Sequence, residues 1–186
     1  MSPLQMPSMM LSFHTGWDEL IKHHPSVSRV FALVVLPMSL LPPAMIYWAG
    51  GNYGDVFIPG VSPEQWHAAA GIFFLAELLT VPFMAWLMHL ASRANDVAAN
   101  FRECFTLASI APIPLWLSSL VLLVPNLVVG VLVGGLALLC SLGLTYRGVY
   151  ALLHMHDDVR ALQMAAVLTG AGLLAWLLLM QIVLIH

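Results

Sequence analysis

Long apolar runs separated by short polar stretches dominate this chain. The runs at 107–124 and 127–144 contain no charge and are separated only by Pro125-Asn126. About 20 apolar residues suffice to cross the hydrocarbon core of a bilayer as a helix. Two helices that are apolar on all sides and joined by so short a turn are antiparallel, and lipid is the solvent that suits them. The pattern predicts an all-α polytopic membrane protein.

The same pattern predicts five transmembrane helices in one membrane domain over residues 30–186. The expected spans cover residues 30–49, 67–91, 104–124, 127–150 and 162–185. Residues 1–29 precede them as a cytoplasmic segment, in which a short amphipathic helix begins near Thr15 and stops at Pro25; a frayed tail is the alternative. No removable signal peptide is recognisable there, so the first span is expected to act as its own insertion signal.

Composition agrees with this architecture and excludes several functions. Hydrophobic residues make up 61% and charged residues 8% of the 186 residues, against roughly 45–50% and 25% in soluble domains. The net charge is -3 and the six Lys and Arg are scattered, which excludes a nucleic-acid surface. Cys104 and Cys140 form no C-x-x-C pair, and no cofactor is expected.

The basic residues predict the orientation. All six Lys and Arg residues lie at helix ends or in connections that are expected to face one side of the bilayer: Lys22, Arg29, Arg93, Arg102, Arg147 and Arg160. The loop around 51–66 and the Pro125-Asn126 turn, on the other side, carry none. The positive-inside rule therefore predicts a cytoplasmic N-terminus and an outside C-terminus.

Prolines interrupt the first span at Pro37, Pro42 and Pro43. Each removes a backbone hydrogen bond, so a kinked or partly unwound helix is expected. The carbonyls freed in this way either form an ion or substrate site or are sealed by neighbouring helices, and we favour the second interpretation.

Glu77 is the most informative side chain, because an acid in the middle of a span marks a functional site by default. Counting residues from the cytoplasmic ends places Ser118 and Ser119 at a similar depth, and the three are the candidate polar core. Either Glu77 takes part in proton- or cation-linked transport, or it is hydrogen-bonded and holds the bundle together, which we favour.

A cluster of His and Asp residues lies between the fourth and fifth spans. His154, His156 and Asp157 offer nitrogen and oxygen donors of the kind that zinc binds, but their spacing does not make a closed site. Histidines at a membrane interface are common without any ligand, so no bound metal is expected.

Small residues on the fourth span indicate close helix packing. Gly130 and Gly134 form a G-x-x-x-G motif, for which we favour contact within the bundle over dimerisation. Motifs of nucleophilic hydrolases, metalloproteases and P-loop enzymes are absent from the sequence, so no enzymatic activity is expected.

A family resemblance is strongest between residues 104 and 160. It is carried by Pro114-Leu115-Trp116-Leu117-Ser118-Ser119-Leu120, by Pro125 and Gly134, and by Tyr146-Arg147-Gly148. These residues resemble the Yip family of five-span membrane proteins, in particular its short bacterial branch. The resemblance implies five spans, a cytoplasmic N-terminus and, through the bacterial branch, a location in a bacterial cytoplasmic membrane.

The resemblance also bears on function. Eukaryotic Yip proteins associate with Rab-type GTPases through a long cytoplasmic segment, whereas about 29 residues precede the first span here, so we do not extend GTPase binding to this chain. The expected function is that of a non-enzymatic inner-membrane protein that organises the membrane or partner proteins, itself included. The alternative is a small transporter or ion-conducting protein built around Glu77.

Overall fold

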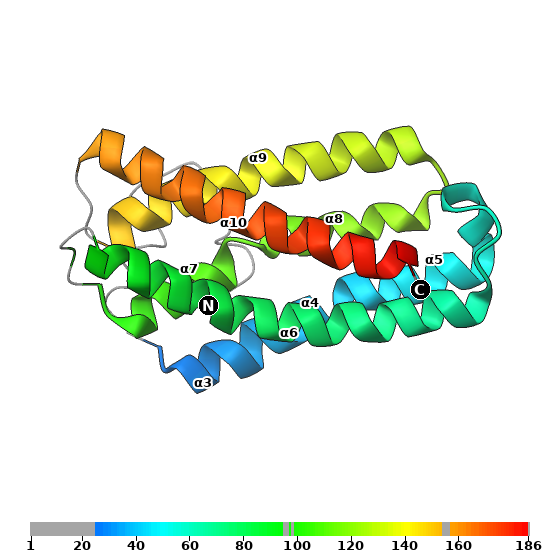
Figure 1. Ribbon diagram of the computed structural model, residues 1–186, viewed down its shortest axis with the longest axis horizontal. Coiled ribbons are helices and arrows are strands. Elements are labelled where there is room, and N and C mark those ends of the chain that lie inside the picture. The colour runs from blue at the N-terminus through cyan, green and yellow to red at the C-terminus, as the bar shows by residue number, and fades with distance from the viewer. Residues whose placement is uncertain (1–24, 95–96, 98, 154–156, 186) are drawn as a thin grey trace.

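The computed structural model describes residues 25–94, 97, 99–153 and 157–185. Within these ranges the chain is helical without strands, and five helical segments are long and apolar enough to cross a membrane. The predicted all-α, five-span class is therefore confirmed. The segments run back and forth along one bundle (Figure 1).

The first span is built from four consecutive helical pieces. They are α3 (Val27–Val30), the π-helical η2 (Phe31–Val35), α4 (Leu36–Ser39) and α5 (Leu41–Phe57). The interruption at Leu40 precedes Pro42 and Pro43, which lack the N–H that would continue the helix from α4. The kinked first span that the prolines predicted is thus present.

The first span is also longer than expected. It reaches Phe57, so residues 50–57, which were assigned to a loop because of their glycines, are helical apart from a kink at Tyr53, whose φ of -154° and ψ of 37° are not those of a helix. The loop that follows is short and contains Gly60, whose φ of 84° only glycine adopts easily. The loop prediction differs from the structure because of a tertiary contact: Gly50 and Gly54 face the Trp66 side chain of the second span.

The second and third spans differ in regularity. α6 (Pro63–Ala94) is one long helix, with Pro82 inside it. The third span, expected to be continuous, consists of α7 (Phe101–Ile110), α8 (Ile113–Ser118) and the 3-10 helix η3 (Ser119–Leu123). Pro112 and Pro114 explain the break after α7, since neither has an N–H to donate to the preceding turn.

The last two spans are α9 (Leu127–Leu152) and α10 (Asp158–Ile185). Asn126 begins α9, and its side-chain oxygen accepts hydrogen bonds from the N–H groups of Val128 at 3.0 Å and Val129 at 3.2 Å. This cap fixes the tight turn after η3. α7 begins with a capping box, in which Asn100 and Glu103 bond reciprocally.

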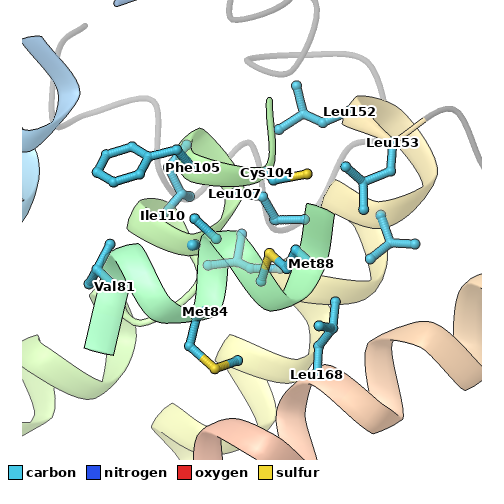
Figure 2. Close-up of a cluster of buried hydrophobic side chains, with 14 of the residues drawn as sticks. Val81, Met84, Met88, Cys104, Phe105, Leu107, Ile110, Leu152, Leu153 and Leu168 are labelled. Carbon is cyan, nitrogen blue, oxygen red and sulfur yellow. The ribbon is translucent and has the colours of Figure 1, made fainter. Parts of the chain in front are cut away.

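Two apolar clusters hold the helices together. The large core joins side chains of α6, α7, α9 and α10, including the fully buried Leu107 and Leu153 (Figure 2). The small core consists of Ile46, Trp66, Ala70 and Phe73, with Leu122 of η3 packed against it. The large core lies toward the end of the bundle where α6 ends and α7 and α10 begin, and the small core lies toward the Pro125 turn (Figure 1).

Candidate functional site

Glu77 lies on α6 between the two cores. Its Oε1 accepts a hydrogen bond from the indole Nε1 of Trp116 on α8, at 3.0 Å. Its other oxygen, Oε2, is also buried but has no hydrogen-bond partner in the protein. The acid therefore bridges the second and third spans through one oxygen and leaves the second oxygen available to a ligand.

The break between α7 and α8 positions Trp116. After Ala111 and Pro112 the chain restarts as a helix, and the Trp116 side chain is only 3% exposed. The carbonyl of Ala111 at the break accepts a hydrogen bond of 2.6 Å from the hydroxyl of Ser141 on α9. This contact satisfies a carbonyl at membrane depth and fixes α8, and hence the indole, relative to α9.

The two serines predicted to lie beside Glu77 bond elsewhere. Ser118 donates to the carbonyl of Leu115 at 2.7 Å, and Ser119 donates to the carbonyl of Trp116 at 2.6 Å. Both contacts are within their own helical turn, so the structure brings neither hydroxyl into a hydrogen bond with Glu77. A count of residues along a span does not give the helix face on which a side chain lies.

Trp116 is the residue that the sequence interpretation missed. A buried tryptophan needs an acceptor for its N–H, and the acid at a similar depth is a suitable one. That pairing of an indole donor with a lone intramembrane acid was the available signal. Pro42 and Pro43 of the kinked first span are buried as well, and α4 and α5 both contact α8.

A second close approach joins the first two spans near the Pro125 end. The indole of Trp66 lies against Gly50 and Gly54 of α5: a Cβ atom would be 2.2 Å from Cγ of that indole at Gly50, and 2.3 Å from its Nε1 at Gly54. The hydroxyl of Tyr53 donates to the carbonyl of Leu122 in η3. Gly50-x-x-x-Gly54 is thus a helix-packing motif that the sequence interpretation took for a loop.

Gly130 and Gly134 of α9 behave differently. A Cβ atom at either position would meet no atom within 4 Å. The structure therefore brings no neighbouring helix against them, and the close packing expected within the bundle is not formed there.

Pro125 lies in the turn and Pro114 in the first turn of α8, as the hairpin pattern indicated.

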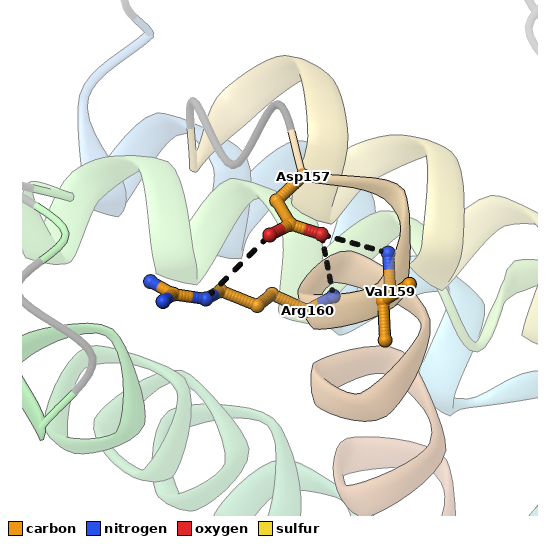
Figure 3. A network of polar contacts seen from close by, with 3 residues as sticks. All are labelled: Asp157, Val159 and Arg160. Atoms are coloured by element: carbon orange, nitrogen blue, oxygen red, sulfur yellow. Dashed lines mark hydrogen bonds and ion pairs between the residues drawn. The ribbon is translucent and has the colours of Figure 1, made fainter.

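Asp157 has a local structural role before α10. Its Oδ1 accepts from the N–H groups of Val159 at 3.0 Å and Arg160 at 3.3 Å, and its Oδ2 lies 3.6 Å from Nε of Arg160 (Figure 3). These contacts cap the helix. His154 and His156 lie outside the described residues, so their predicted place beside Asp157 is not described. Among the described residues, no three His, Cys, Asp or Glu side chains form a metal-binding group.

These observations define a polytopic membrane protein with five spans, in which polar contacts tie the first, second and fourth spans to the third: Tyr53 with Leu122, Glu77 with Trp116, and Ser141 with Ala111. A family model described as the Yip1 domain matches residues 8–179, and the chain belongs to the Yip family. The resemblance read from the hairpin residues is confirmed. No curated protein and no solved structure matched the chain.

Proposed function

We propose that this Yip-family protein is a non-enzymatic membrane protein that organises the membrane or partner membrane proteins. The observation that supports this function best is the use of the polar groups inside the bundle. Trp116, Ser141 and Tyr53 each donate from one span to another. Contacts of this kind hold a bundle together and need no substrate.

The apolar outer surface supports the same proposal. Val128, Leu132, Leu136 and Leu139 of α9 are between 64% and 68% exposed, and they lie along the helix at a helical spacing. Such a surface is in contact with lipid or with the apolar face of another membrane protein. α9 therefore offers the broad contact face that an organising protein needs.

A crosslinking experiment and a flux experiment test this function together. With a photoreactive amino acid at Leu132, which is 68% exposed, we expect discrete adducts with membrane proteins in a bacterial host, whereas the same amino acid at Leu144 on the same helix, which is 5% exposed, should give none.

In liposomes, wild type and Glu77→Gln are expected to pass protons and monovalent cations no faster than empty vesicles. Flux in the wild type that is lost in Glu77→Gln would contradict the organising role and support the transporter alternative.

We further propose that the protein lies in a bacterial cytoplasmic membrane with its N-terminus in the cytoplasm. Arg29, Arg93, Arg102 and Arg160 belong to the helix ends at one end of the bundle, and the Ile58–Ser62 connection and the Pro125 turn at the other end carry no Lys or Arg (Figure 1). The resemblance to the short bacterial branch supports the location. The positive-inside rule then assigns the arginine-bearing end to the cytoplasm.

Cysteine labelling of intact cells tests this orientation. In a background with Cys104→Ala and Cys140→Ala, a membrane-impermeant maleimide is expected to label Asn126→Cys directly, because Asn126 lies exposed in the turn. Ser26→Cys, exposed just before α3, should be labelled only after the cells are permeabilised. The reverse pattern, or equal labelling of both, would refute the orientation.

A further inference from the structure

Glu77 occupies a boundary between two apolar clusters. On α6, Phe73 belongs to the small core and Val81 to the large core, four residues to either side of Glu77. On the first span the same change occurs between Val35 and Ile46. The carboxyl group thus lies in the layer that separates the two cores, and Trp116 is its single donor in the protein as described.

Along its own helix, Glu77 is well separated from every other titratable group. On α6 and on the helices packed against it these groups are Tyr47, Tyr53 and Asp55 of α5; Glu64, His67, His89 and Arg93 of α6; Arg102, Glu103 and Cys104 of α7; and Asp158 and Arg160 of α10. α4 and α8 carry none. The nearest on α6 are His67 and His89, ten and twelve residues from Glu77, which is about 15 Å or more along the axis. Among the described residues, Glu77 forms no ion pair that would offset a charge on its carboxyl group.

Glu77 has three possible states: an ionised carboxylate with nothing bound at Oε2, a carboxylate that binds a metal cation, or a carboxyl group with a proton on Oε2. An uncompensated carboxylate at membrane depth carries a large desolvation cost. A metal cation requires several oxygen ligands, and among the described side chains Oε2 is the one carboxyl oxygen that is buried without a hydrogen-bond partner. A proton needs only that one oxygen and removes the charge, and a neutral O–H costs far less than a carboxylate when buried without an acceptor.

We propose that Glu77 is an intramembrane proton-binding site and that Trp116 is its positioning residue. The lone pair of Oε2 takes a proton from the solvent, the O–H bond that forms neutralises the carboxylate, and no other bond breaks in the protein. Oε1 remains the carbonyl oxygen, and it accepts the indole N–H at 3.0 Å. This site is independent of the organising role, because a bundle that binds a proton need not transport one.

Infrared spectroscopy of the full chain in lipid nanodiscs at neutral pH tests the site. We expect the carbonyl-stretch band of a protonated carboxyl group in the wild type, and its complete loss in Glu77→Gln. Trp116→Phe should keep the band and shift it to higher frequency, because the carbonyl loses its N–H donor. Glu64→Gln, which alters an exposed acid at the start of α6, should leave the band unchanged.

The outcomes separate the proposal from its alternatives. A wild type with no protonated-carboxyl band, or a band that survives Glu77→Gln, overturns it. A carboxylate band that moves with sodium concentration overturns it in favour of a cation. If Glu77→Gln does not yield folded protein, glutamate labelled with ¹³C in the wild type identifies the band through its isotope shift, and the Trp116→Phe shift then assigns it to Glu77. The flux assay reads out transport separately, so the organising role and the proton site fail independently.

Discussion

Replacing Gly54 by alanine is expected to destabilise the bundle by about 1–3 kcal/mol, the usual cost of overpacking a closely packed contact. The added Cβ would lie 2.3 Å from Nε1 of Trp66, and the Trp66 ring is itself buried between α5 and α6. The ring or the helix must therefore move, which disturbs the small core. Thermal or denaturant unfolding of the purified protein in detergent measures the change.

Gly51→Ala is the matched control for this prediction. Gly51 lies on the same helix but is exposed, and its nearest neighbour to an added Cβ is Nε2 of His67 at 3.9 Å, an ordinary contact. Since alanine is more favourable than glycine in a helix by about 1 kcal/mol, Gly51→Ala should be neutral or stabilising. Equal stability of the two variants would show that Trp66 does not pack on the Gly50–Gly54 face.

Removing the Trp116 side chain is expected to be the most damaging single change. Trp116→Ala opens a cavity beside α6, for which buried tryptophan and phenylalanine residues typically cost about 3–5 kcal/mol. It also leaves Oε1 of Glu77 without its donor. The same unfolding assay measures the loss, and Trp86→Ala, at a side chain that is 51% exposed on α6, should have little effect.

The hydrogen bond is separated from the packing by Trp116→Phe. This variant retains an aromatic ring but no N–H, and we expect a loss of about 0.6–2 kcal/mol, the range for polar contacts between membrane helices. A double-mutant cycle with Glu77→Leu, which removes the acceptor, isolates the pairwise term. A coupling of zero in that cycle would mean that the contact between Glu77 and Trp116 contributes nothing to stability.

The hairpin and the prolines were predictable because their signals are local. The apolar runs on both sides of Pro125-Asn126 are long enough to cross lipid whatever they pack against, and Pro42 and Pro43 interrupt hydrogen bonding within their own helix. Pro112 and Pro114 carry the same local signal, although the third span was expected to be one helix. The depth of Glu77 was predictable for the same reason. The prediction of a loop at residues 50–57 was wrong. Glycines indicate a loop unless a side chain from another helix packs against them, as Trp66 does here.

The partner of each polar side chain was not predictable from depth. Ser118 and Ser119 lie within three residues of Trp116, yet the indole and not a serine reaches Glu77. Similarly, a Cβ atom added at either glycine of the G-x-x-x-G motif of α9 would meet no atom within 4 Å, whereas Gly50 and Gly54 of α5 pack against a tryptophan. In each case the rotation of one helix about its axis decides the contact.

The sequence by itself determined that the chain is a five-span helical membrane protein, because the cost of placing unpaired backbone and charge in lipid acts on each segment separately. The tertiary structure alone decided which faces of those helices meet. Lipid is as apolar as leucine, so a span with apolar residues all round carries no hydrophobic signal for its buried side. Only the packed bundle shows that Trp66 lies on Gly50 and Gly54, and that Trp116 donates to Glu77.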